Sequence, residues 1–288
     1  MYRFILCFAL LLISFSITGA ESKDQVPTIL VSVAPYKYFV EQIAGDTVNV
    51  HLMVPAGASA HTFEPTPKQM LKASSANLWF TIGESFEARA VKTLQSYNSN
   101  FAAIDLRDHV ELISADGINA CHHCSNPNCQ DLHIWLSPRQ SKKQAEHIAT
   151  VLTARYPQHQ DRYQAALKNF LEELDKLDEE ITQTLKPLQN RLVLVSHPAY
   201  AYLCRDYGFA QLSIEFEGKD PTPLQLTRIL NTARNAKIQT VFVQPQYSSK
   251  GAKLIAEKIG AKVVSLDPYS EDYLNSMRLV AKSFADGN

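Results

Sequence analysis

Hydrophobic and polar positions alternate along this chain in two blocks that share one rhythm. Short runs rich in β-branched and other apolar residues are each followed by a loop or by an amphipathic stretch with helical spacing. The runs cover 28–34, 48–54, 78–82 and 101–106 in the first block, and 191–196, 210–216, 240–244 and 261–266 in the second. Buried strands that alternate with helices are typical of parallel sheets covered on both faces. The pattern therefore predicts an α/β protein with two Rossmann-like (β/α) lobes.

The segment between the two blocks has a different pattern. From 158 to 185 it contains neither glycine nor proline, and apolar side chains recur at spacings of three and four. The stripe consists of Tyr163, Leu167, Phe170, Leu174, Leu177, Ile181 and Leu185. It predicts one rigid helix of roughly 40 Å, ended by Pro187, that joins the lobes. A coiled-coil dimer is the competing interpretation, but we favour internal packing and a monomer.

These patterns divide the chain into an N-terminal lobe over 21–157, a linking helix over 158–187 and a C-terminal lobe over 188–288. Open α/β sheets bind ligands outside the carboxyl ends of their strands. The cleft between the lobes is therefore the expected site.

The first 20 residues have the pattern of a secretory signal peptide. Arg3 precedes an apolar run over 4–17, and small residues at Thr18 and Ala20 come before the polar "ESKD". This run is shorter than the ~20 residues that span a bilayer, which argues against a membrane anchor. We expect cleavage after Ala20 and a soluble protein in the periplasm.

Charge narrows the possible functions. Without the signal peptide, 268 residues remain, with 27 basic and 29 acidic side chains. Nucleic-acid binding needs a basic face, so this balance gives no support for a nucleic-acid partner.

Side chains that can bind metal follow several predicted strands. His61 lies in a loop just past a strand, and His133 precedes an apolar turn. His197 and Asp267 stand at the carboxyl ends of strands in the second block. A single loop histidine is more often structural, and an x-D-P motif is more often a turn or a helix cap. Together, however, three imidazoles and one carboxylate form a four-coordinate set that suits Zn²⁺.

Four segments carry a specific resemblance: "GASAHTFEPTPKQM", "DLHIWLSPRQ", "LVLVSHPAYAYLCRDYGF" and "QYSSKGAKLIAEKIGAKVVSLDPY". They resemble the metal-binding solute-binding proteins of ABC transporters, in the zinc- and manganese-uptake group. They come in that family's order and cover essentially the whole mature chain. The resemblance implies two lobes, a long linking helix, and a metal between the lobes held by His61, His133, His197 and Asp267. It also implies a protein without enzymatic activity that passes a divalent metal ion to a membrane permease.

The resemblance leaves the choice of metal open. His197 stands where manganese-binding members often have glutamate. Three nitrogen ligands suit Zn²⁺, whereas Mn²⁺ favours oxygen. We therefore expect zinc, with manganese as the alternative and iron behind both.

Some positions depart from the family pattern. Ala60 stands where some zinc members have an acid before the first histidine, and Gln244 where members often have glutamate. The latter change puts a supporting role for that side chain in doubt. Glu215 and Glu217 are alternative carboxylate ligands that could replace or supplement Asp267.

A cysteine- and histidine-rich stretch lies before His133. It contains Cys121, His122, His123, Cys124 and Cys129. The spacing to His133 would allow a small zinc knot, but an oxidising compartment favours a disulfide between two of the three cysteines. The third would pair with Cys204 or stay free, although Cys204 itself has the pattern of a buried apolar cysteine. His133 cannot serve this knot and the cleft at once, so we expect either a disulfide-bonded surface loop or an accessory metal loop using its two histidines.

Two other functions stay open. A zinc hydrolase would need an open coordination position, and the chain has no H-E-x-x-H helix. A surface adhesin with an incidental metal is the other.

Overall fold

The computed structural model describes residues 26–114, 130–215 and 221–287, so the predicted signal peptide over 1–20 lies outside the described residues. Eight strands of four residues each are present in the described residues, and every one falls within a predicted run. They are β1 (Thr28–Val31), β2 (Asn49–Leu52), β3 (Leu78–Thr81), β4 (Ala102–Asp105), β5 (Leu192–Val195), β6 (Ala210–Ser213), β7 (Thr240–Val243) and β8 (Lys262–Ser265). The predicted strands are thus confirmed, although each is shorter than its apolar run.

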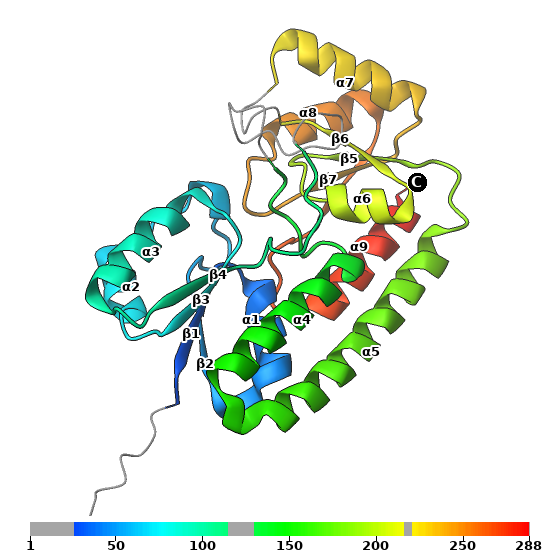
Figure 1. The fold of residues 1–288 in the computed structure, drawn as a ribbon. Helices are drawn as coiled ribbons and strands as arrows, with labels where there is room; N and C mark the ends of the chain where they lie inside the picture. Colours follow the sequence, from blue (N-terminus) through cyan, green and yellow to red (C-terminus); the bar gives the residue numbers. More distant parts are fainter. Residues whose placement is uncertain (1–25, 115–129, 216–220, 288) are drawn as a thin grey trace, which may run out of the picture.

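The strands form two parallel sheets with the same topology (Figure 1). Their orders are β2-β1-β3-β4 and β6-β5-β7-β8. In each sheet the first strand lies between the second and the third, so the chain changes direction across the sheet at that strand. Loops at this switch point are where open α/β sheets bind ligands. The α/β fold with two lobes is therefore as the sequence predicts.

Helices connect the strands and cover the sheets. They are α1 (Ala34–Ala44), α2 (Pro67–Ala73), α3 (Ser85–Tyr97), α4 (Pro138–Arg155), α5 (Gln160–Leu185), α6 (Ala201–Tyr207), α7 (Pro223–Asn235), α8 (Lys250–Ile259) and α9 (Tyr273–Asp286), with short 3-10 turns at Gly45–Thr47, Ala60–Thr62 and Pro157–His159. Local sequence sets their ends. The Thr222 hydroxyl accepts from the backbone N–H of Gln225 and forms a capping box with it at the start of α7. Gly208 and Gly260 end α6 and α8 with φ of 73° and 72°, a conformation that costs glycine little.

Helix α5 is the predicted linking helix. Its 26 residues span about 39 Å, and it runs along both lobes in Figure 1. Six of the seven stripe positions are buried, and Leu167 is partly buried against the same core. The apolar stripe thus packs against the core of this same chain. The limits of the lobes at 21–157 and 188–288 stay predictions.

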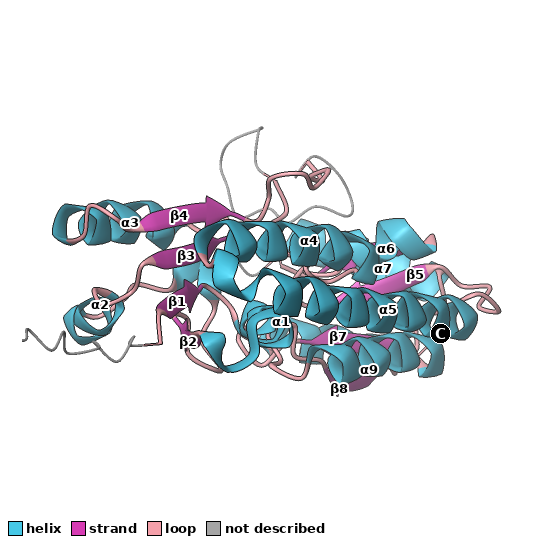
Figure 2. Ribbon diagram, turned by 60° about the horizontal axis from the view of Figure 1, so that its bottom comes forward, coloured by secondary structure: helices cyan, strands magenta, loops and turns pink. Residues whose placement is uncertain are grey.

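One hydrophobic core continues through both lobes. The helices α1, α4, α5 and α9 pack beside one another and form a layer that both sheets share (Figure 2). Phe39 of α1 lies 5.3 Å from the ring of Phe170 of α5 and 4.8 Å from the ring of Tyr273 of α9, between ring centroids. Because α9 follows the last strand of the second lobe, these contacts tie that lobe to the first. A smaller core lies under α7 and α8.

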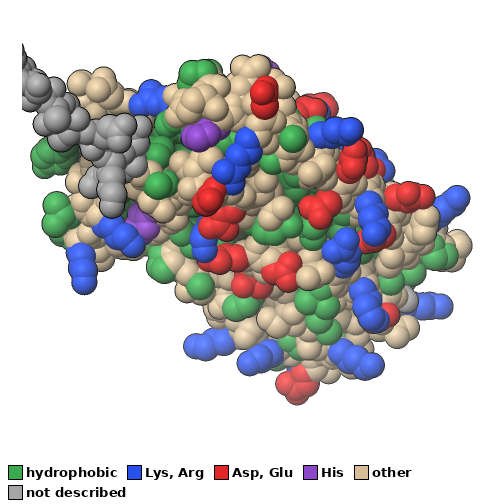
Figure 3. Space-filling model, turned by 90° about the horizontal axis from the view of Figure 1, so that it is seen from below, with side chains coloured by type: hydrophobic (Ala, Val, Ile, Leu, Met, Phe, Trp, Pro, Cys, Tyr) green, Lys and Arg blue, Asp and Glu red, His purple; other side chains and the backbone are tan. Residues whose placement is uncertain are grey.

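The described residues bear on three further expectations. The face in Figure 3 carries interspersed acidic and basic side chains rather than one extended basic area. No helix in the ranges given above combines the length and hydropathy that a bilayer span requires. Cys204 is fully buried and has a free thiol, as expected for an apolar cysteine, and burial raises the pKa of that thiol.

Candidate metal centre

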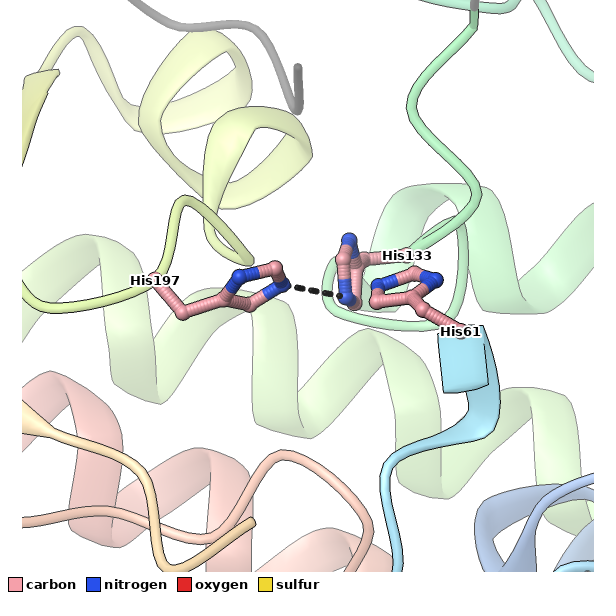
Figure 4. Close-up of side chains that lie close together, drawn as sticks. All are labelled: His61, His133 and His197. Atoms are coloured by element: carbon pink, nitrogen blue, oxygen red, sulfur yellow. Dashed lines mark hydrogen bonds between the residues drawn. The ribbon is translucent and has the colours of Figure 1, made fainter. Parts of the chain in front are cut away.

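Three histidines from distant parts of the chain meet between the two sheets (Figure 4). His61 lies in the 3-10 turn that follows β2, His133 in the turn before α4, and His197 two positions after the end of β5. One nitrogen of each ring lies within 4.8 Å of the other two. The ring centroids are 5.1, 5.2 and 5.3 Å apart, so the rings form a nearly equilateral triangle. The structure thus brings together the three histidines that the sequence singles out.

The spacing of the nitrogens fits a small tetrahedral cation. The Nε2 atoms of His133 and His197 are 3.4 Å apart. Two nitrogens that bind one tetrahedral zinc at about 2.0–2.1 Å are themselves about 3.3–3.4 Å apart. Both rings are fully buried, and the His61 side chain is 6% exposed. The triangle is therefore shielded from water.

Each histidine has a carboxylate on its other ring nitrogen, Nδ1. The distances from Nδ1 to the nearest carboxylate oxygen are 3.0 Å for His61–Glu84, 2.8 Å for His133–Asp131 and 3.0 Å for His197–Glu215. An ionised carboxylate can only accept a hydrogen bond, so each pair fixes the proton on Nδ1 and leaves the lone pair on Nε2. Carboxylate–histidine pairs of this kind orient metal ligands and raise their basicity.

The sequence reasoning missed two of these carboxylates. Glu84 and Asp131 are 4% and 0% exposed. Asp131 stands two positions before His133 in "DLH", and this local spacing was the one available signal. Glu84 is 23 positions from His61, and only the fold brings it there.

Glu87 holds the turn that carries Glu84. Its carboxylate accepts hydrogen bonds from the backbone N–H groups of Ile82 at 3.0 Å, Gly83 at 2.7 Å and Glu84 at 2.9 Å, and from the Ser32 hydroxyl. Burial raises the pKa of Glu87 to about 7, and the hydrogen bonds from Ser32 and the backbone oppose this increase. The buried Glu87 thus fixes the backbone position of Glu84, from which the Glu84 side chain extends toward His61.

Gln244 holds the backbone of His197. Its Oε1 accepts from the Ser196 hydroxyl at 2.6 Å and from the His197 N–H at 3.1 Å, and its Nε2 donates to the His197 carbonyl at 2.9 Å. An ionised glutamate could accept but not donate, so the amide suits this position. The doubt that the sequence raised about a supporting role here is removed.

The structure places the predicted carboxylate ligands differently from the histidines. Asp267 is exposed and lies outside the group of converging ligand atoms. Its Oδ1 accepts from Gln246 Nε2 at 2.7 Å and from the Tyr269 N–H at 2.9 Å. Glu215 contacts Nδ1 of His197 rather than the side of the ring that faces the other histidines.

The remaining predicted positions lie outside the described residues. These are Glu217, Cys121, Cys124, Cys129, His122 and His123. The accessory metal loop and the disulfide therefore stay predictions.

Comparisons with known proteins decide the family. The family model described as "ZnuA: Zinc-uptake complex component A periplasmic" matches residues 29–287. The chain belongs to the ZnuA family. This confirms the resemblance to metal-binding solute-binding proteins that the sequence carries.

Relatives of the ZnuA family resemble the chain over nearly its whole length. A protein of Chlamydia muridarum (strain MoPn / Nigg), named as a candidate metal-binding protein with no metal specified, is 36% identical over 96% of this chain and 98% of its own. The high-affinity zinc uptake system protein ZnuA of Bacillus subtilis (strain 168) is 26% identical over 86% of this chain and 80% of its own. A crystal structure of ZnuA is 36% identical, with a TM-score of 0.84 over 91% of this chain and 99% of that one.

Proposed function

We propose that this protein captures Zn²⁺ in the periplasm and delivers it to the membrane permease of an ABC importer. The observation that carries the proposal is the convergence of one ring nitrogen from each of three histidines, each of which has a carboxylate next to its Nδ1. Family membership supports the transport role.

The donor set supports zinc over manganese. Three neutral imidazoles supply borderline-soft nitrogen ligands, and Mn²⁺ prefers sites rich in oxygen. Manganese is the alternative cargo within the same family. The names of the relatives are mixed on this point, since one specifies zinc and another specifies no metal.

We propose Asp267 as the fourth ligand. Its carboxylate lies on the loop that follows β8, at the carboxyl end of the second sheet, the same edge from which His197 reaches the centre. Its Oδ1 accepts from Gln246, and its carboxylate does not lie among the converging ligand atoms, so it must move closer to the histidines to bind the metal. The three histidines would therefore receive the ion first, and Asp267 would then close the site.

The metal itself can be tested directly on the purified protein. Metal-free protein is titrated with Zn²⁺ or Mn²⁺ in competition with a chromophoric chelator. We expect one tightly bound Zn²⁺, weaker Mn²⁺ binding, and loss of tight binding in His197→Ala. His159→Ala, at the start of α5 and outside the centre, is the matched control and should bind as the wild type does. Equal zinc affinity in His197→Ala and wild type would refute the site.

Delivery needs a test in cells. A deletion strain should fail to grow under zinc chelation, and the wild-type gene, but not the His197→Ala gene, should restore growth. Normal growth of the deletion strain combined with altered surface attachment would favour an adhesin instead. Gel filtration of the mature protein with light scattering checks the expected monomer.

A further inference from the structure

A tyrosine lies flat against one of the three histidines. The rings of Tyr247 and His197 are stacked, with centroids 3.9 Å apart and planes 16° apart. Tyr247 belongs to the loop between β7 and α8, and its ring is also 6.3 Å from that of His61. His197 is fully buried, whereas Tyr247 is partly exposed. The tyrosine ring therefore forms an outer layer over this histidine.

The hydroxyl of Tyr247 reaches a side chain near each of the other two histidines. It lies 3.4 Å from the Ser59 hydroxyl, two positions before His61. It also lies 3.4 Å from the hydroxyl of Tyr269, whose ring is 6.5 Å from that of His133. Ser59 belongs to the first lobe and Tyr247 to the second, 188 positions later. One side chain thus contacts His197 and the neighbours of both other histidines, across the two lobes.

The loop that carries Tyr247 also forms a hydrogen bond with Asp267, the proposed fourth ligand. Gln246, next to Tyr247, donates to Asp267 at 2.7 Å. A movement of this loop would therefore uncover His197 and release Asp267 together.

From these contacts we infer that Tyr247 is a positioning residue that fixes the His197 ring and covers the metal centre, and so slows release of the bound ion. The inference rests on the proposed function, because it assumes that the three histidines hold a metal. Removing the ring takes away one of the contacts that hold the His197 ring, beside its hydrogen bond with Glu215, and admits water, which competes for the metal and its ligands. The shell around a metal site controls solvent access in this way.

The test measures the rate of zinc release. Zinc-loaded protein is mixed with excess chromophoric chelator in a stopped-flow instrument. We expect Tyr247→Ala to release zinc at least tenfold faster than wild type. Tyr247→Phe keeps the stacked ring and loses the hydroxyl with its two 3.4 Å contacts, so its rate should stay within about threefold. The control is Tyr97→Ala, which removes a tyrosine that is 77% exposed on α3, and it should release zinc at the wild-type rate.

A spectroscopic measurement separates positioning from general destabilisation. In Co²⁺-loaded protein, Tyr247→Ala should change the visible ligand-field spectrum, and Tyr247→Phe should leave it unchanged. A Tyr247→Ala release rate within twofold of wild type, or an unchanged Co²⁺ spectrum, would overturn the inference. Should the alanine variant fail to fold, Tyr247→Leu, which keeps apolar volume without a flat ring, is judged by the same criteria. Failure of the wild type to bind zinc would instead overturn the proposed function.

Discussion

The charge of Asp131 should be worth a measurable part of the zinc affinity. Asp131 is fully buried, and its Oδ1 accepts from both Nδ1 and the backbone N–H of His133, each at 2.8 Å. In Asp131→Asn the amide oxygen can keep both hydrogen bonds, so the ring keeps its orientation. The substitution therefore removes the charge and changes little of the geometry.

The magnitude follows from the distances. Adding the imidazole ring and a Zn–N bond of about 2.0 Å to the 2.8 Å hydrogen bond puts the Asp131 oxygen about 6–7 Å from the metal. A single negative charge and a divalent cation at that separation attract by about 5 kcal/mol at an effective dielectric constant of about 20. This is an upper bound, because water and the protein partly compensate for the lost charge. Removing carboxylate partners of metal-bound histidines typically lowers affinity by about 10–100-fold, or about 1.4–2.7 kcal/mol.

Chelator competition at fixed pH measures the change. We expect the zinc Kd of Asp131→Asn to rise 10–100-fold. The control is Asp175→Asn, whose side chain is 60% exposed and pairs with Lys142 on the surface. That variant should keep the wild-type Kd. The new amide group would occupy the place of Asp131 Oδ2, which has no hydrogen-bond partner among the described residues, so some loss of stability is also expected. A Kd for Asp131→Asn within threefold of wild type would refute the electrostatic reasoning.

Three further predictions concern stability, packing and the fourth ligand. Burial raises the pKa of Glu87 from 4.5 to about 7, so the folded metal-free protein holds this proton more tightly than the unfolded chain does. The stabilisation is fully present below pH 4.5 and is lost as the pH rises through 7, a change of about 3 kcal/mol in the free energy of unfolding. Urea unfolding should show this decrease in wild type and not in Glu87→Gln. Phe170→Ala should lower the free energy of unfolding by about 3–5 kcal/mol, because Phe170 is 1% exposed and packs among aromatic neighbours. The control Leu279→Ala, at a position that is 54% exposed, should lower it by less than about 1 kcal/mol. Equal losses in the two variants would contradict the packing argument. Asp267→Ala should weaken zinc binding at least tenfold, and an unchanged Kd in the competition assay would remove Asp267 from the proposed ligands.

Much of the fold is predictable because parallel strands are buried on both faces. Such strands read as continuous apolar runs, and all eight appear in the sequence as such runs. The ends of the strands are not predictable in this way, since the run over 28–34 continues beyond β1 into a turn and the start of α1. Val33 is buried there without belonging to a strand. Hydrophobicity reports burial, whereas a strand ends where its hydrogen-bonded neighbour ends.

Some residues of the candidate centre can likewise be predicted from the sequence, and others cannot. His197 stands two positions after a buried strand, so its place at the carboxyl edge of the sheet can be predicted from the sequence. The partner of His61 is not, because Glu84 reaches it through the packing of the turn after β3, which Glu87 holds. For Asp267, the sequence predicts the position after β8 but not the hydrogen bond with Gln246, because that bond depends on a loop conformation that no local pattern encodes.

The placement of the acidic side chains, rather than their number, bears most directly on the metal. Glu84, Asp131 and Glu215 supply enough carboxylate oxygen for a site suited to Mn²⁺, but all three contact Nδ1 atoms on the outer sides of the rings. The atoms that face the centre are nitrogens, which supports the zinc proposal. The carboxylates still contribute charge, because they make the electrostatic potential at the centre negative without entering the coordination shell. A site built in this way attracts any divalent cation through its charge and distinguishes Zn²⁺ from Mn²⁺ through the donor atoms that bind the ion. Replacing His197 by an acid should accordingly shift preference toward Mn²⁺, whereas replacing Asp131 by asparagine should weaken both metals by similar factors.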